Sequence, residues 1–265
     1  MTDKLITSAK AFAINTAEQV SEVLRSAKPF QIREKDGASD LQTDYDILVE
    51  DMIRSAIAET FPTHTIVAEE RGTSGAQDSE WAWYVDPIDG TCNFANGLPW
   101  YSVSMTLMRE GEPVVGVVAA PALRQIYHAT QGGGAYLNKE AIHVADTTSL
   151  GGRIAMMELA NHARWPGFNQ LAAHLEANLC TLRVMGSSAL SLASVAAGVS
   201  CGASMSGSNP IDVSAGVLLV REAGGIVMDA SGQRDGFPQH GLVAGAEQIA
   251  ESFWQLAFAA KGTTV

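Results

Sequence analysis

A short apolar and aromatic run over residues 81–85 ends in the stretch Asp86–Thr91, which reads DPIDGT. Runs of this length and composition predict a buried strand. Pro87 keeps the acid before it extended and cannot donate a ladder hydrogen bond. Gly90 lets the backbone turn, and Thr91 stands where a helix can begin with its first amides unpaired. The stretch therefore predicts a strand end that offers two carboxylates, a hydroxyl and free amides to a hard cation and a phosphate.

A second pair of acids follows a second short strand. Residues 65–68 are β-branched and apolar enough to predict a strand, and Glu69 and Glu70 come directly after it. If this strand lies parallel to and beside the strand over 81–85, both sets of carboxylates meet at one edge of the sheet. Ligand sites of α/β proteins favour that edge.

Two further acids, Asp46 and Asp212, stand at predicted helix starts. One helix is predicted to begin at Thr43 or Asp44, which puts Asp46 in its first turn, and another is predicted over residues 212–223. For an isolated acid the simpler interpretation is stabilisation of the helix dipole. The acids that end the two strands favour a shared site instead.

The rest of the N-terminal part predicts further helices and hairpins. An amphipathic helix is predicted over residues 4–26, and antiparallel strand pairs over 102–119 and 125–139. Residues 72–80 predict a polar loop, and the polar stretch 138–150 predicts a boundary between subdomains.

Beyond residue 150, predicted strands and helices alternate up to a closing helix over residues 247–260. A chain of 265 residues suffices for one large layered unit or for two subdomains that share a cleft. We therefore predict an α/β protein with an N-terminal α+β subdomain, 1–145, that carries the acidic motif. A C-terminal α/β subdomain, 146–265, completes one compact unit with the site between the two.

The composition of the chain limits which binding partners and which cellular compartment are expected. The formal net charge of -12 argues against a nucleic-acid backbone or an anionic membrane as partner. The three cysteines, Cys92, Cys180 and Cys201, are widely spaced without a CxxC pair, so neither a disulfide framework nor a zinc site is predicted. The N-terminus has no signal pattern, and no apolar run has the length of a membrane span. These features predict a cytoplasmic protein.

Oxygen ligands alone select hard cations, so the acids at the element boundaries predict Mg²⁺, with Mn²⁺ as the second choice. Two such cations that share a bridging carboxylate polarise a phosphate ester and turn water into a nucleophile near neutral pH. A threonine hydroxyl paired with a carboxylate can orient that water and relay its proton.

Other interpretations of these acids are open at this level. Scattered surface acids would explain the composition equally well. Glycosidases also use paired carboxylates, but a glycosidase leaves the Gly90-Thr91 corner unexplained. The sequence has no nucleophile-elbow motif, so a serine hydrolase is not predicted. The run Gly132–Gly134 lacks the Lys-Ser/Thr of a phosphate loop and predicts a tight turn.

Taken together, the motifs resemble those of the inositol monophosphatase family. The resemblance is carried by Asp86–Thr91 with Asn93-Phe94, by the strand end Ala68–Glu70, and by Asp212–Gly216 with Glu222–Gly225. Their order and spacing fit over nearly the whole chain. The resemblance implies an alternating αβαβα sandwich of the inositol monophosphatase and fructose-1,6-bisphosphatase type. It also implies a homodimer and Mg²⁺-dependent, lithium-sensitive hydrolysis of a small phosphomonoester of the inositol-1-phosphate type.

The resemblance further implies roles for single residues. Glu69, Asp86 and the Ile88 carbonyl would hold the first metal, and Asp86, Asp89 and Asp212 the second, with two or three Mg²⁺ per site in all. The implied catalytic residues are Glu69, Thr91 and Asp46, of which Thr91, paired with Asp46, would position the attacking water. The implied phosphate and substrate contacts are Asp89, Gly90, Thr91, Ser188 and Asp212. Lys35 falls in the loop that folds over the site in the family.

Two positions depart from the family pattern. Ile211 stands where the family has a Trp before Asp212, and Met205 stands where inositol phosphatases have a Glu that binds ring hydroxyls. The alcohol side of the site is therefore predicted to be altered. Several hypotheses follow. Ser206 or Ser208 could substitute for that Glu in a phosphatase that still accepts inositol phosphate, or the protein could be a broader polyol or sugar phosphatase. The alternatives are a phosphatase of another ester such as histidinol phosphate, and a non-catalytic regulatory or binding protein on the same fold.

Overall fold

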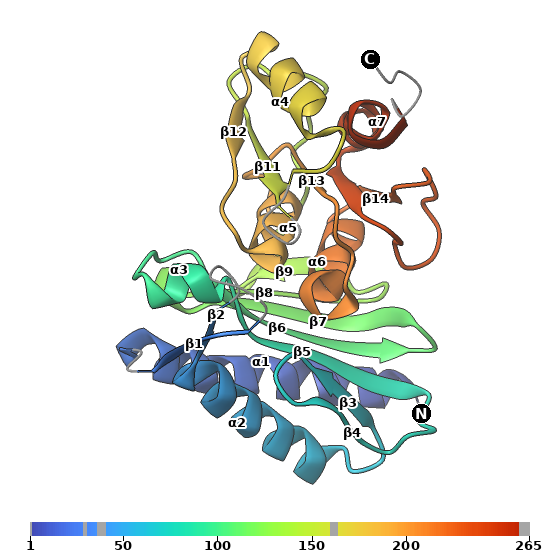
Figure 1. Cartoon of the computed structure of the whole chain (residues 1–265). Coiled ribbons are helices and arrows are strands. Elements are labelled where there is room, and N and C mark those ends of the chain that lie inside the picture. The colour runs from blue at the N-terminus through green and yellow to red at the C-terminus, as the bar shows by residue number, and fades with distance from the viewer. Residues whose placement is uncertain (1, 29–30, 36–40, 160–163, 260–265) are drawn as a thin grey trace.

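Helices and sheets alternate in five layers across the molecule (Figure 1). The computed structural model describes residues 2–28, 31–35, 41–159 and 164–259. The predicted αβαβα sandwich is confirmed. In order, the layers are helices α1 (Thr2–Ser26) and α2 (Asp44–Thr60), an eight-stranded sheet, helices α5 (Ser188–Ala196) and α6 (Pro210–Glu222), a five-stranded sheet, and helices α4 (Phe168–Ala177) and α7 (Glu247–Trp254).

The eight-stranded sheet is antiparallel except where β3 meets β5. Its spatial order is β10 (Glu140–Ile142), β9 (Ala135–Leu137), β8 (Gln125–Thr130), β7 (Glu112–Ala120), β6 (Ser102–Arg109), β5 (Trp81–Asp89), β3 (Thr65–Ala68) and β4 (Gly72–Gly75). β3 and β5 are parallel neighbours with Ala68 beside Val85, as the sequence predicts. Both strands therefore end at the same edge.

Two strands of this sheet lie where the sequence predicts none. β4 lies within the expected polar loop over 72–80, and β10 lies within the expected boundary stretch 138–150. The residues of β4 are all exposed, so no apolar alternation marks them. Pairing with β3 makes them a strand, and that pairing is not visible in local sequence.

The five-stranded sheet is built from the second half of the chain. Its spatial order is β12 (Thr181–Arg183), β11 (Ile154–Glu158), β13 (Gly202–Met205), β15 (Leu242–Gly245) and β14 (Ile226–Asp229). β11 is parallel to both of its neighbours. α7 passes into a π-helical turn over Gln255–Ala259, and the last residue of the predicted closing helix lies outside the described residues.

Smaller elements complete the fold. β1 (Ile32–Glu34) and β2 (Leu41–Thr43) form a two-stranded antiparallel sheet. The others are α3 (Thr91–Ala95) and a 3₁₀ turn over Pro121–Leu123. No helix of the described residues combines the length and apolarity needed to cross a bilayer. The three cysteines are free.

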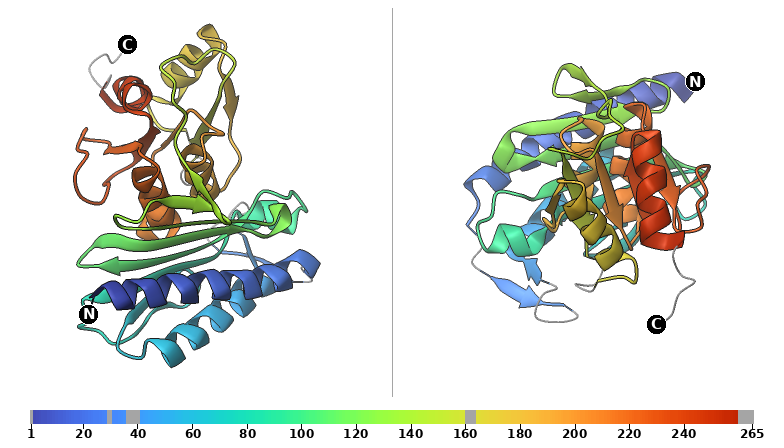
Figure 2. Two further views of the ribbon diagram at one scale, coloured as in Figure 1. Left: turned by 180° about the vertical axis from the view of Figure 1, so that it is seen from behind. Right: turned by 90° about the horizontal axis from the view of Figure 1, so that it is seen from above.

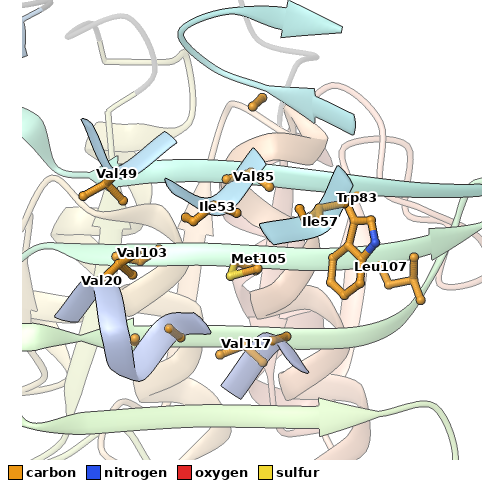
Figure 3. Close-up of a cluster of buried hydrophobic side chains, with 14 of the residues drawn as sticks. Val20, Val49, Ile53, Ile57, Trp83, Val85, Val103, Met105, Leu107 and Val117 are labelled. Carbon is orange, nitrogen blue, oxygen red and sulfur yellow. The ribbon is translucent and has the colours of Figure 1, made fainter. Parts of the chain in front are cut away.

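The outer helices cover one face of the eight-stranded sheet. α1 and α2 lie along it side by side in Figure 2, and Figure 3 shows their side chains meeting those of β5, β6 and β7. Ile53, Trp83 and Met105 are among the fully buried side chains there. Side chains such as Ile53 and Met105 contribute about 1.5–3 kcal/mol each when fully buried.

The middle layer is apolar on every side. The residues of α5 from Ala189 to Ala196 are all buried, as expected for a helix enclosed between two sheets. Gly116 of β7 allows α6 to approach closely, since a Cβ there would lie 3.0 Å from the Cα of Ala215. This packing sets where the N-termini of α5 and α6 lie, and both reach the edge at which β3 and β5 end (Figure 1).

Candidate active site

The end of β5 forms the floor of the candidate site. Asp86 and Asp89 are both buried, and the register with β6 shifts between them, where Pro87 cannot donate to the ladder. The Ile88 amide donates to Asp86 Oδ1 at 3.0 Å. Gly90 has a φ of 95° as the N-cap of α3, so the chain turns directly after the second acid.

β3 delivers Glu69 to the same place. The Glu69 amide donates to the Val85 carbonyl at 3.2 Å, which sets this acid beside Asp86. Lys35 Nζ lies 2.9 Å from Glu69 Oε1 and 2.5 Å from Glu70 Oε1. Gln42 also donates to Glu70. The predicted convergence of the two strand ends is confirmed, and the loop residue Lys35 lies against both glutamates.

Asp46 links the cap of α2 to Thr91. Its Oδ2 accepts from the Thr43 amide at 2.7 Å and from Thr43 Oγ1 at 2.5 Å, which completes a capping box. Its Oδ1 accepts from Thr91 Oγ1 at 3.0 Å, and Thr91 Oγ1 also lies 2.9 Å from the Ile88 carbonyl. Asp46 thus has both the helix-start role and the contact that the family resemblance implies.

The N-terminus of α5 donates hydrogen bonds to the carboxylate of Asp89. Asp89 Oδ2 accepts from Ser187 Oγ at 2.5 Å, from the Ala189 amide at 2.8 Å and from Ser102 Oγ at 3.3 Å. Asp89 Oδ1 accepts from the Ser188 amide at 3.2 Å. Ser188 was expected at the site, whereas Ser187 and Ser102 were missed. Short polar residues beside a predicted helix start are a weak signal for such contacts.

Two other residues hold the turn before α5, and sequence reasoning gave neither of them a role. Asn93 Nδ2 donates to the carbonyls of Trp100 at 2.7 Å and Met185 at 2.6 Å. Glu158 accepts from the Gly186 amide at 2.7 Å and from Ser191 Oγ at 2.5 Å. Glu158 ends strand β11, so the rule that singled out Glu69 would also have found it.

Asp212 reaches the site from the first turn of α6. Asn209 caps this helix, and its Nδ2 lies 3.3 Å from Asp212 Oδ1. A cavity of about 330 Å³ opens beside Asp212. The described residues that line it are Glu158, Leu159, Ser188, Met205, Gly207, Asn209, Asp212 and Val213.

The two serines that could substitute for the ring-binding Glu of inositol phosphatases do not line this cavity. Neither Ser206 nor Ser208 lines it, and Ser208 Oγ instead accepts from the Gly241 amide at 3.2 Å. Met205, in contrast, lies in the cavity wall. The described wall of this cavity therefore contains neither of the two serines of that hypothesis.

The buried acids repel one another. Burial, followed by the charges of Glu69, Asp89 and Asp212, raises the pKa of Asp86 well above its usual value. Burial and the charges of Asp89 and Glu69 raise the pKa of Asp212 to about 7. Burial raises the pKa of Asp46 and of Asp89 to about 6 in spite of their hydrogen-bond donors. Bound positive charge would relieve this repulsion.

The oxygen atoms that the site offers are suitable ligands for a hard cation, although the acids are not spaced as they are around a bound metal. Carboxylates and the Ile88 carbonyl are oxygen donors, the kind that Mg²⁺ prefers. Within the described residues, no group of three or more His, Cys, Asp or Glu side chains has the spacing of a metal centre. Lys35 partly neutralises Glu69 and Glu70.

Comparison with known proteins places this arrangement in a family. The family model described as "Inositol monophosphatase family" matches residues 2–257. An inositol-1-monophosphatase of Mesorhizobium japonicum is 37% identical over 215 residues, which cover 80% of this chain and 81% of that protein. The Nus factor SuhB of Pasteurella multocida is 34% identical over 244 residues, with 89% and 91% covered.

A solved structure agrees with the sequence comparisons. The extragenic suppressor protein suhB of Bartonella henselae superposes with a TM-score of 0.87 at 28% identity, covering 97% of this chain and 100% of that one. The order of motifs, the layered fold and these matches lead to one conclusion. The chain belongs to the inositol monophosphatase family, whose members are phosphoric monoester hydrolases.

Proposed function

We propose that this protein is a Mg²⁺-dependent phosphomonoesterase that hydrolyses a small polyol or sugar phosphate. The observation that carries the proposal is the convergence of four acids from β5, the end of β3 and the start of α6. The Thr91–Asp46 hydrogen bond follows the acids of β5 directly, and a cavity opens beside one of the four acids, Asp212. The name of the Mesorhizobium relative supports an inositol-phosphate type of substrate.

In this proposal, Glu69, Asp86 and the Ile88 carbonyl would hold one cation, and Asp86, Asp89 and Asp212 would hold a second, with Glu69 supporting a weaker third. When bound, such cations supply Lewis-acid charge to the phosphate ester and lower the pKa of water. Lys35 contacts Glu69, so cation binding competes with this ion pair.

The chain's own groups then divide the remaining work. Thr91 Oγ1 donates its only proton to Asp46 or to the Ile88 carbonyl, which leaves its lone pairs to orient a water molecule. Asp46, with its pKa raised to about 6, is suited to accept a proton near neutral pH. The amides of Gly90 and Thr91 face the phosphate, and Ser188 in the cavity wall contacts the alcohol.

The decisive experiment is a phosphate-release panel of inositol, sugar, histidinol and adenosine phosphates, with and without Mg²⁺ and lithium. We expect release that requires Mg²⁺ and is inhibited by lithium. Asp86→Asn should abolish both turnover and calorimetric Mg²⁺ binding. Asp78→Asn, at an exposed acid near the opposite end of β5, serves as the matched control and should change neither. Full turnover in EDTA, or in Asp86→Asn, would refute the metal assignment.

Other outcomes of the panel point to the alternative functions. Preferred release from histidinol phosphate would favour the non-inositol phosphatase, an alternative motivated by Met205 in the cavity wall. No release from any ester would favour a regulatory or binding protein, which the name of the Pasteurella relative, Nus factor SuhB, also motivates. Partner capture that is unaffected by Asp89→Asn would then support that role.

We further propose a cytoplasmic homodimer in which each site lies between subdomains 1–145 and 146–265. The resemblance to the family supports the dimer, and the free cysteines are compatible with a reducing compartment. The hydrogen bonds between Asp89 and the start of α5 join the two proposed subdomains. Light scattering of the purified protein tests the dimer, which a monomeric mass at working concentration would exclude.

A further inference from the structure

The cavity beside Asp212 has a one-sided charge. Two of its lining residues, Glu158 and Asp212, are acids, and no lysine or arginine occurs among the described residues that line it. The other side chains of the wall are apolar or neutral: Leu159, Met205, Val213, Ser188 and Asn209. A group that enters this cavity therefore meets negative charge, neutral hydrogen-bonding groups and apolar surface.

Glu158 lies deep in this wall. It ends β11 directly beside Met205, its register partner at the end of β13. Its side chain is buried, and the contacts of its carboxylate come from the amides of Gly186 at 2.7 Å and Met185 at 3.4 Å and from the Ser191 hydroxyl at 2.5 Å. All of these donors are neutral.

The charge of Glu158 is therefore not cancelled by an ion pair among the described residues. Neutral donors stabilise a carboxylate but do not remove its charge. Lys35, the basic side chain that contacts the acids of the candidate site, forms its ion pairs with Glu69 and Glu70. Glu158 is outside the proposed ligand set, so the cations of this proposal would be held by Asp212 and not by Glu158. Water screens a buried charge less than an exposed one, so the repulsion between Glu158 and an anion in the cavity is stronger.

We propose that this cavity selects phosphate monoesters whose alcohol part is neutral or cationic, and that Glu158 makes it reject esters with a second anionic group. The selection rests on the proposed phosphatase function, because the cavity would hold the alcohol of the ester being cut. Bisphosphates and carboxylated phosphate esters are then poor substrates. Neutral polyol monophosphates and amino-alcohol monophosphates are accepted.

Three esters of one size and different charge test this selection. They are 3-hydroxypropyl phosphate, 3-aminopropyl phosphate and 3-phosphonooxypropanoate, assayed for kcat/KM with the full chain in saturating Mg²⁺. The assay is run at pH 8 because burial raises the pKa of Glu158 to about 7. We expect kcat/KM for the anionic ester to be lower than for the neutral ester by about tenfold or more, from one charge–charge repulsion.

Variants assign the effect to the cavity. Glu158→Gln should reduce the neutral-to-anionic ratio several-fold, and Met205→Lys should bring it to unity or invert it. Because each ratio is taken within one variant, a general loss of activity from a disturbed turn cancels. Asp78→Asn removes a charge near the far end of β5 and should leave the ratio unchanged.

The outcomes separate the selection from the phosphatase function itself. Equal kcat/KM for the three esters, or an unchanged ratio in Glu158→Gln, would overturn the selection while leaving the phosphatase function in place. If none of the three esters is hydrolysed, the panel of inositol, sugar, histidinol and adenosine phosphates decides whether the phosphatase function fails, and calorimetric binding of the same three esters measures the selection without turnover. Equal affinities in that measurement would overturn it as well.

Discussion

At the scale of single residues, Asp46 connects stability to chemistry. One carboxylate oxygen closes the capping box of α2 through Thr43, and the other accepts from Thr91. A capping box fixes the position of its acid relative to the helix start. The helix cap therefore holds Asp46 at the place where the hydroxyl of Thr91 can use it, 45 residues along the chain.

Truncation of Thr91 tests the role proposed for its hydroxyl. Thr91→Ala should lower kcat by about 10²-fold or more, because the group that orients the attacking water and relays its proton is lost. Thr91→Ser keeps the hydroxyl and should retain most of the activity. Steady-state phosphate release measures both variants, and a kcat within twofold of wild type in Thr91→Ala would contradict the assigned role.

At the scale of elements, the turn before α5 is held by hydrogen bonds from three separate elements. Asn93 of α3 holds it through the Met185 carbonyl, Glu158 of β11 holds it through the Gly186 amide, and Asp89 holds it from β5. Gly90 and Gly186 let the two turns approach, since a Cβ at Gly90 would lie 3.0 Å from the Gly186 carbonyl oxygen.

Asn93 offers a test of this coupling with an internal control. Asn93→Ala removes donors to the Trp100 and Met185 carbonyls, which should cost about 1–3 kcal/mol of unfolding free energy and raise KM. Asn96→Ala removes an exposed contact at the end of α3, to the Cys92 carbonyl, and should cost less than about 1 kcal/mol. Urea denaturation compares the two, and equal losses would argue against the bridge.

The contact between β7 and α6 is a second element-scale test. Gly116→Ala forces a methyl group to within 3.0 Å of the Ala215 Cα, so it should lower the unfolding free energy by about 1–3 kcal/mol. Gly151→Ala meets no atom closer than 3.8 Å and serves as the control. Urea midpoints measure both, and a Gly116→Ala protein as stable as wild type would mean that the layers separate easily.

At the scale of the whole molecule, the buried acids make stability depend on pH and on cations. Burial raises the pKa of Asp212 and of Glu158 to about 7, above the unfolded values. The folded protein therefore binds more protons than the unfolded chain between about pH 4 and pH 7, and its stability falls as the pH rises through this range. His64 and His128, whose pKa values are lowered by burial, act in the opposite direction below about pH 6.5.

In EDTA, we expect the unfolding free energy to fall between pH 6 and pH 8, by on the order of 1 kcal/mol for each of the two acids. Mg²⁺ should stabilise the protein more at pH 8 than at pH 6, because cation ligands must be deprotonated. Thermal melts measure both trends. Asp212→Asn should flatten the trend in EDTA, and stability that rises from pH 6 to pH 8 without cations would contradict the account.

Much of the layered fold was predictable, because its long elements carry strong periodicity. The helix over 4–26 and the hairpin over 102–119 lie close to the predicted bounds. β4 and β10 were not predictable, since their mostly exposed residues form strands only by pairing with a neighbouring strand. Among the site residues, the acids at strand ends were predictable from position. Ser187 and Ser102 were not, because no local pattern shows that they contact Asp89.

The sequence by itself determined the type of chemistry and the family. An apolar strand that ends in DPIDGT commits the backbone to a turn and its acids to one sheet edge, whatever the rest of the chain does. Only the tertiary structure decided what lies opposite these acids. Side chains from β11, β13 and α6, about 70 to 125 residues away in sequence, meet there because two sheets enclose α5 and α6. Long-range packing of this kind has no local signature, and it makes Glu158 and Met205 the neighbours of the proposed substrate.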